Sequence, residues 1–550
     1  MPLVNQEEHR LSASRLCEAN NVYAVGLETG VVSFYSQQCR AFDLARLFAK
    51  KQDIKSLQEN KIGIIGGGVA GTTLWAALQA YGFEDVTLYE ASDEILSRQA
   101  SADHRHAHPA INDWPRFDAN RKFSSTTKWP FLNWFGADAA SVVRQMRDDP
   151  YIKELRAKAP NGVKLRHLAV KISDRLESDA TGLPPVTVNF QTQQGSCQDY
   201  FCTLFLAVGY DYEIGLNHSA SNSYWWPDNV REYLWDRHEY GEYQFLMSGT
   251  GDGGLIDLVR LAERPNLEGG RYNVAMEVVA HLRDKTYQAL DNNWESRPSK
   301  KEKEFVNAIE YDDIDQDTIV RIFKDLFEEG SFQSYFVDNP DLERITLLAR
   351  NGSFLQGNAS PVYKVLTSYL ASRVRNLVKK GYVTQNGRPS HLNADGTDGG
   401  PLHTDQNFAT VVVFTRHGAK SRVDSIEGVA KLRGEHTTST DSGDVVNYDI
   451  ADVFEGLRES HGRSARPDEM AHIETLVAQY LDTFFDDASF EFSEDDDAVW
   501  INVRVPLSPE NKRAYKRLGG FDKELFGIDV VYNEAAGFDL TTETMEAPGV

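Results

Sequence analysis

Cysteine is scarce in this chain of 550 residues: there are four, and no two of them form a Cys-x-x-Cys pair. Four thiols are too few for a disulfide framework in a protein of this size. The missing Cys-x-x-Cys spacing also excludes the redox-active disulfide of a dithiol reductase. We therefore expect a reducing compartment, the cytoplasm.

Long apolar runs and excess positive charge are also lacking. No uninterrupted apolar run approaches the ~20 residues of a membrane span, and the first residues show no basic segment followed by an apolar one, so no signal peptide is expected. Lys and Arg number 58 against 82 Asp and Glu, a formal net charge of −24. This balance argues against nucleic-acid or anionic-membrane partners, although it does not exclude a local basic pocket. The length predicts two or three domains.

The stretch from 61 to 90 is the most informative part of the sequence. A short apolar run leads into Gly66, Gly68 and Gly71, spaced as Gly-x-Gly-x-x-Gly, and a helical segment and a second strand that ends at Glu90 follow. This order is typical of a dinucleotide-binding unit. Gly66 permits a sharp turn, Gly68 permits close approach of a pyrophosphate, and Gly71 permits helix–strand packing. Glu90 is placed to accept the hydroxyl groups of a ribose, and an ordinary strand–turn–helix is the alternative.

A second unit of this type is predicted from residue 243. A strand runs into Gly249, Gly251 and Gly254, and its partner strand, which ends at Arg350, arrives much later than in a standard unit. Something helical is therefore inserted at about 262–340. Helices are predicted there around 274–282 and 319–327. Two interpretations of this insertion are left open: a lid and a dimerisation arm.

Other elements are predicted from periodicity and turn residues. In chain order they are a strand at 31–35, helices at 41–48 and 137–147, strands at 163–173, 186–192 and 201–208 that form a small meander, a helix from Ser360 to Gly381, a loop at 386–407, and strands at 409–415 and 498–505. From residue 420 to 498 the chain is acidic and poorly patterned.

Two nucleotide units joined by a meander resemble the two-dinucleotide-binding-domain flavoproteins, a superfamily that includes flavin-dependent N-hydroxylating monooxygenases and thioredoxin-reductase-like enzymes. The family's strand ending in Ala-Thr-Gly-Tyr is matched by residues 207–210, with Val208 in place of Thr. Residues 249–254 look like the family's Gly-x-Gly-Asp-Ser-Ala. The resemblance covers roughly residues 60–415.

The resemblance implies an α/β fold with an FAD-binding Rossmann-like domain that carries a β-meander, and a second Rossmann-like unit with a helical insertion. The expected domains are an N-terminal β-α extension at 1–60, the FAD-binding domain at 61–240, an NAD(P)-binding-like domain at 241–419, and an acidic region of unknown role at 420–550. An alternative for the second glycine turn is a structural relic that binds nothing.

The resemblance also assigns residues to cofactors. It implies that the FAD contacts are Gly66, Gly68, Gly71, Glu90, Val170 through its backbone at the adenine, and Gly209, and that Gly249, Gly251 and Gly254 cradle the nicotinamide dinucleotide. Arg350 stands where a guanidinium suits a 2′-phosphate, so NADPH is preferred over NADH. Arg98 or Arg105 could contact a cofactor phosphate.

The segment 101–115 is dense in His, Arg and Trp. His106 or His108 could lie at the flavin face as an acid or base. Two other interpretations stay open: structural loop histidines, or a metal site built with His104, for which no carboxylate or thiolate completes the ligands. We therefore predict no metal. The aromatic segment 224–226 is either a wall over the substrate or simple core.

Together these features predict an FAD-dependent oxidoreductase, reduced by NAD(P)H, that acts on a small amine or amino-acid-like molecule, as a monooxygenase. One alternative is an amine or amino-acid oxidase or dehydrogenase that does not use NAD(P)H. Another is a nucleotide-bound sensor or scaffold with little turnover. A homo-oligomer or a protein partner could form through the insertion or the C-terminal region.

Overall fold

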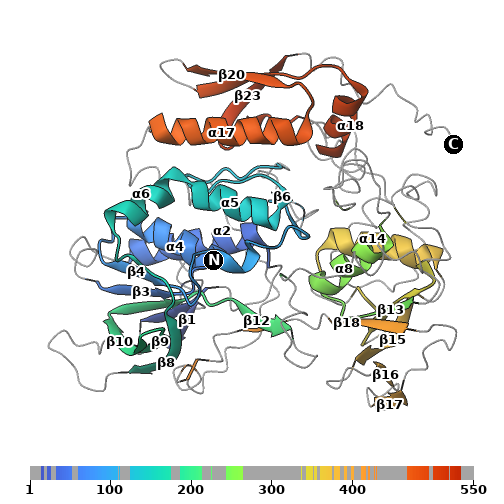
Figure 1. Cartoon of the computed structure of the whole chain (residues 1–550), viewed down its shortest axis with the longest axis horizontal. Coiled ribbons are helices and arrows are strands. Elements are labelled where there is room, and N and C mark those ends of the chain that lie inside the picture. The colour runs from blue at the N-terminus through green and yellow to red at the C-terminus, as the bar shows by residue number, and fades with distance from the viewer. Residues whose placement is uncertain are drawn as a thin grey trace, which may run out of the picture.

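The computed structural model describes residues 11–51, 60–174, 186–213, 243–263, 342–421 and 467–533, with short gaps inside these ranges, and six isolated residues. Figure 1 shows three units: a first α/β unit at the left, a second at the right, and a C-terminal unit above the first. The sheets of the first and second units are mostly parallel and are covered by helices, so the predicted α/β fold class is confirmed. None of the helices in the described ranges is long and apolar enough to cross a membrane.

The first unit is a six-stranded sheet between helices and a meander. Its strand order is β1 (Arg15–Cys17), β2 (Val22–Ala24), β11 (Thr203–Leu206), β3 (Ile62–Ile65), β4 (Val86–Tyr89) and β7 (Val163–Lys164). All neighbours except β1 and β2 pair in parallel. Helices α2 (Phe34–Lys50) and α4 (Val69–Ala80) pack on one face and form one apolar core with it, and the meander forms a second core on the other face.

The N-terminal extension adds two strands to this sheet, β1 and β2, but not the strand predicted at 31–35. Phe34 and Tyr35 begin α2, because Ser33 caps the helix. The Ser33 hydroxyl accepts the Ser36 N–H at 3.0 Å, and the Ser36 hydroxyl accepts the Ser33 N–H at 2.9 Å. This reciprocal cap fixes the helix start. The strand preference of residues 31–35 is therefore outweighed by the helix cap at Ser33.

The predicted meander is confirmed, with a shifted third strand. It consists of β8 (Leu168–Asp174), β9 (Val186–Thr192) and β10 (Gly195–Phe201), all antiparallel. The run predicted at 201–208 is divided: Phe201 ends β10, and β11 returns to the parallel sheet. The run predicted at 163–173 is divided in the same way between β7 and β8.

The second unit has the strand order β17 (Asp398–Pro401), β16 (Pro389–Leu392), β15 (Val378–Val383), β14 (Ile345–Ala349), β13 (Tyr243–Ser248) and β18 (Thr410–Thr415). Helices α8 (Asp252–Ala262) and α14 (Pro361–Arg373) lie together on one face (Figure 1). Two expectations were wrong here. The helix from Ser360 ends at Arg373, because the chain beyond it pairs with β14, and the predicted loop at 386–407 contains β16 and β17.

Two short strands join the units. Strand β12 (Tyr210–Glu213), which leaves the first unit, pairs antiparallel with β19 (Ala419–Ser421), which returns from the second. The returning chain then reaches the meander, where Ile426 and Val429 are buried in its core. The predicted insertion helices lie outside the described residues.

The C-terminal unit is a compact α/β layer and not the unpatterned region expected. Helices α17 (Pro467–Phe484) and α18 (Pro509–Leu518) accompany a sheet of β20 (Ser489–Glu494), β21 (Val499–Arg504), β23 (Ile528–Asn533) and β22 (Glu524–Leu525). Only the strand near 498–505 was predicted. Figure 1 places α17 above α5 (Ala139–Asp148) and α6 (Pro150–Lys158) of the first unit.

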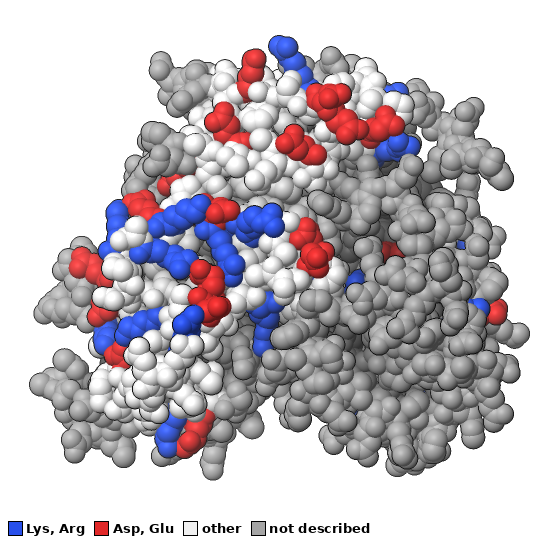
Figure 2. Space-filling model, in the orientation of Figure 1, with Lys and Arg blue, Asp and Glu red and all other residues white. Residues whose placement is uncertain are grey.

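Charge is unevenly distributed on the described surface. Figure 2 shows Lys and Arg gathered over the first unit, and mostly Asp and Glu over the C-terminal unit. Between 144 and 166 seven Lys or Arg stand against three Asp or Glu. Several of these cations are paired, as in Arg156–Glu94 at 3.0 Å and Lys153–Asp148 at 2.9 Å. The basic face is therefore partly neutralised from within the unit.

Candidate nucleotide sites

The first glycine turn connects β3 to α4 in a conformation that demands glycine. Gly66 has a φ of +106°, and a Cβ there would lie 2.4 Å from the Ala207 carbonyl oxygen. A Cβ at Gly71 would lie 1.8 Å from the Gly66 carbonyl oxygen. Both positions exclude every other side chain, so the helix packs directly on the turn.

Gly68 differs from these two, because a Cβ there would meet nothing within 4 Å. It is the N-cap of α4, with extended backbone, and its side-chain position faces open space. The N-terminus of α4 presents backbone N–H groups and a positive dipole end to that space. An anionic pyrophosphate fits this arrangement.

Glu90 lies beside the same turn, at the end of β4. Its carboxylate accepts the Gly67 N–H at 2.6 Å and the Ser92 N–H at 2.8 Å. These two bonds hold the side chain against the loop before α4. A ribose next to the pyrophosphate would meet this carboxylate, as the sequence predicts.

The second glycine turn repeats the first. Gly249 has a φ of +123°, and Gly251 is the N-cap of α8 with nothing within 4 Å of a Cβ. Gly254 is buried inside α8. Asp252 turns its carboxylate away to α14, where Oδ1 accepts the Ser360 N–H at 2.6 Å and the Ser360 hydroxyl at 2.7 Å. The Asp252 carboxylate therefore points away from the place where a pyrophosphate is predicted, although the residue begins the helix.

The other predicted cofactor residues occupy the edges of these turns. Gly209 follows β11 with a φ of +64° and open space around it, and Arg98 lies in η1 (Ser97–Gln99) after β4. Arg350 is exposed directly after β14. The Val170 carbonyl accepts the Glu427 N–H at 3.1 Å, so that oxygen is already engaged by the returning chain. The role of each in cofactor binding stays a prediction.

His106 and His108 lie on and just after a two-residue strand, β5 (His106–Ala107), that pairs with β6 (Ala137–Asp138). Their rings stack with centroids 6.5 Å apart. Removal from water lowers the pKa of His106 to about 4, against the opposing charge of Asp138. Burial, and then His106, hold the pKa of His108 well below its usual value, and His108 Nδ1 accepts the Ile111 N–H at 3.1 Å. Both rings are therefore neutral at pH 7. Within the described residues no cluster of His, Cys, Asp and Glu is suited to a metal ion.

This histidine pair makes stability depend on pH. The pKa of His106 is about 4 in the folded chain and 6.5 for the free side chain, so the unfolded chain binds the proton more readily. Stability is therefore full above pH 6.5 and falls as the pH drops towards 4, by up to about 3 kcal/mol for this group. We expect urea unfolding of His106→Gln to show a smaller loss over this pH window than the parent. An unchanged slope would contradict the assignment.

Two residues have neighbours other than those the sequence suggested. The Arg105 guanidinium, a candidate phosphate ligand, contacts the Asp257 carboxylate of α8. Trp225, a candidate substrate wall, packs edge-on against Phe34 with ring centroids 5.7 Å apart. Both contacts join segments far apart in the sequence, and no local pattern indicates them.

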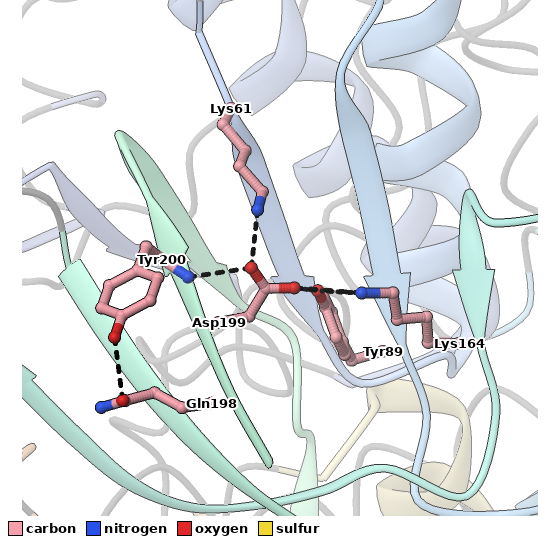
Figure 3. A network of polar contacts seen from close by, with 6 residues as sticks. All are labelled: Lys61, Tyr89, Lys164, Gln198, Asp199 and Tyr200. Atoms are coloured by element: carbon pink, nitrogen blue, oxygen red, sulfur yellow. Dashed lines mark hydrogen bonds and ion pairs between the residues drawn. The ribbon is translucent and has the colours of Figure 1, made fainter.

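A polar network that the sequence did not reveal ties the meander to the parallel sheet. Figure 3 shows the Asp199 carboxylate of β10 between Lys61, Lys164 and the Tyr89 hydroxyl. Lys61 Nζ lies 2.6 Å from Oδ1, and Lys164 Nζ lies 3.0 Å from Oδ2. Burial favours the neutral acid, but these hydrogen bonds outweigh it and hold the pKa of Asp199 well below its usual range. Burial, and then the bond to Asp199, raise the pKa of Tyr89. The meander is thus fixed directly behind the strand that ends at Glu90.

Asp199→Asn tests this junction. Asn keeps the shape of the side chain but loses the charge that two lysines share, so we expect a loss of about 1–2 kcal/mol in the free energy of unfolding. Glu154→Gln is the matched control, because it breaks an ion pair with Lys158 whose lysine side chain is 67% exposed. Its expected effect is under about 0.5 kcal/mol. If both variants lost the same free energy of unfolding, the Asp199 network would stabilise the protein no more than an exposed ion pair does.

The C-terminal unit packs against the segment 124–136 of the first unit and forms hydrogen bonds to it. Asp522 accepts the Ser125 hydroxyl at 2.6 Å and the Ser125 N–H at 3.1 Å. Phe135 is buried in the apolar core of the C-terminal unit and packs edge-on against Tyr480 at 5.9 Å. A Cβ on the adjacent Gly136 would lie 2.6 Å from His108 Cδ2. The segment 124–136 therefore contacts the C-terminal unit and, at its end, also His108.

Comparison with known proteins gives structural neighbours only. No family model matches the chain, and no curated protein matches it. The chain is similar to the ornithine N-hydroxylase of Kutzneria sp. 744, solved with reduced FAD, NADP+ and L-ornithine, at 12% identity, covering 68% of this chain and 84% of that one with a TM-score of 0.29. It is also similar to the reduced form of ornithine hydroxylase from Pseudomonas aeruginosa, at 10% identity, 66% and 82% coverage and a TM-score of 0.22.

Both neighbours are named ornithine hydroxylases, and neither shares more than 12% identity with this chain. The function of this chain therefore rests on its own two glycine turns and on the residues around them.

Proposed function

We propose that the chain is an FAD-dependent oxidoreductase whose first unit binds FAD. The observation that supports this most strongly is the open N-terminus of α4 above Gly68, with the Glu90 carboxylate held beside it. Backbone N–H groups at this end would bind the pyrophosphate, and Glu90 would accept ribose hydroxyl groups. Gly66 and Gly71 permit the close packing that brings helix and loop to this position.

The second unit is proposed to bind NADPH in the same way. Gly251 opens the N-terminus of α8 as Gly68 opens α4, and Asp252 is bound to Ser360 and so leaves the N–H groups for an anion. Arg350 after β14 suits a 2′-phosphate. NADPH is therefore the proposed donor, in preference to NADH.

Bound FAD would supply hydride acceptance and electron transfer to O₂ or to an organic substrate. The chain's own residues would bind and orient the two nucleotides, and the rings of His106 and His108 stay neutral and so add no charge beside them. A small amine or amino-acid-like substrate and a monooxygenase outcome complete the proposal. These finer points rest on the family resemblance of the motifs.

Anaerobic mixing of the purified, FAD-loaded protein with NADPH and, separately, with NADH tests the proposal. We expect NADPH to bleach the flavin absorption band faster than NADH, and Arg350→Ala to weaken NADPH binding about tenfold while leaving NADH binding unchanged. A yellow protein that neither nucleotide bleaches would refute the NADPH site and favour an oxidase that takes hydride directly from its substrate.

A further inference from the structure

One buried ion pair joins the two nucleotide units. Arg105 of the first unit is 1% exposed and Asp257 of α8 is 0% exposed. The guanidinium and the carboxylate meet at two points: Nη1 contacts Oδ1, and Nη2 lies 3.3 Å from Oδ2. Arg260 of the same helix also contacts Asp257 Oδ1, at 3.1 Å, but its side chain is 14% exposed and lies within the second unit.

Each partner is rigidly placed within its own unit. The Arg105 carbonyl accepts the Ala139 N–H at 2.7 Å, which fixes this residue to the start of α5, and His106 follows it directly on β5. Asp257 lies less than two helical turns beyond Gly251 on α8. The pair therefore connects the histidine strand of one unit to the helix whose N-terminus is the proposed NADPH site of the other.

The chemistry of the pair suits it to fix how the two units are oriented, and not to hold them together. Two charges removed from water contribute little net stability, and similar apolar side chains would hold two surfaces together at least as well. A guanidinium that meets a carboxylate at two points instead fixes both distance and direction. Hydride transfer needs that kind of precision, because a misplacement of about 1 Å can cost about 100-fold in rate.

We propose that Arg105 and Asp257 are positioning residues that hold α8, and the nicotinamide nucleotide bound to it, at hydride-transfer distance from the first unit. This inference rests on the proposed function. It assigns the pair no contact with either cofactor. The pair acts through the helix that it anchors.

The test compares Arg105→Met/Asp257→Leu with Arg260→Met in the full-length protein. The double variant replaces both charges of the junction by apolar groups, so neither Arg105 nor Asp257 is left buried without the other, a loss that would cost about 3–5 kcal/mol. Arg260→Met removes the other contact to Asp257, which the double variant also loses, and leaves the ion pair of Arg105 and Asp257 in place. Hydrogen–deuterium exchange of peptides 102–109 and 252–262, in the nucleotide-free protein, reports on the junction itself. Flavin reduction by NADPH and by dithionite reports on its consequence.

We expect the double variant to exchange faster in both peptides, to bind FAD and NADPH within about threefold of the parent, and to be reduced by NADPH about 100-fold more slowly. Dithionite, which needs no docking, should reduce it at the parental rate, and Arg260→Met should behave as the parent in all assays. Unchanged exchange, or an unchanged rate with NADPH, overturns the proposal. If NADPH fails to reduce even the parent, the proposed function is what fails, and exchange alone then decides whether the pair holds the units.

Discussion

Gly71→Ala should prevent the first unit from folding stably. Its new Cβ would lie 1.8 Å from the Gly66 carbonyl oxygen, and that neighbour is backbone in a turn that already has a φ of +106° at Gly66. Neither atom can move without separating α4 from β3. We expect the free energy of unfolding to fall by more than about 4 kcal/mol. Thermal unfolding and the soluble yield of the purified variant measure this effect.

The control for Gly71→Ala is Gly68→Ala, three positions earlier in the same turn. A Cβ at Gly68 meets nothing within 4 Å, and its φ of −74° suits alanine. The melting temperature of this variant should stay close to that of the parent. If Gly71→Ala were equally stable, the close packing of helix on turn would be refuted.

Gly68→Ala should lose FAD while it keeps its fold. The added methyl group enters the space where we place the pyrophosphate, and it would push the phosphates away from the N–H groups of α4. Losing one or two charge-assisted hydrogen bonds, at about 1.5–3 kcal/mol each, predicts a fall in FAD affinity of about 100-fold. Isothermal titration of the apoprotein with FAD measures it.

Gly251→Ala is the matched variant in the second unit, with a φ of −79° and the same open surroundings. It should bind FAD as the parent does but lose NADPH binding. The two variants thus separate the two nucleotides. If Gly68→Ala kept its FAD, the first turn would not be the pyrophosphate site, whatever the second turn does.

Both glycine turns could be predicted from the sequence because their physics is local. A strand, a turn that only glycine can make and a helix N-terminus follow one another within a few residues, and each leaves a mark in the sequence. The same holds for β9, β13 and β14, whose apolar runs are short and bounded by turn residues. The strand ends before Gly66 and Gly249 and the helix start after Ser360 were therefore predicted correctly.

What failed depended on distant partners. The predicted helix from Ser360 continues past Arg373 by apolar spacing, but residues 378–380 pair with β14 and residues 381–383 pair with β16. The core of the C-terminal unit also takes in Phe135, far away in the chain, and no local pattern indicates that contact. Asp199 contacts Lys61 across 138 residues of sequence and Asp257 contacts Arg105 across 152, so no local pattern indicates either of these two contacts.

The most direct test of the central claim is the flavin content of the parent and of Gly68→Ala after both are saturated with FAD and passed through a desalting column. We predict that the parent elutes yellow with about one FAD per chain and that Gly68→Ala elutes colourless at the same melting temperature. A folded parent that retains no FAD, or a Gly68→Ala protein that retains as much FAD as the parent, would contradict the account.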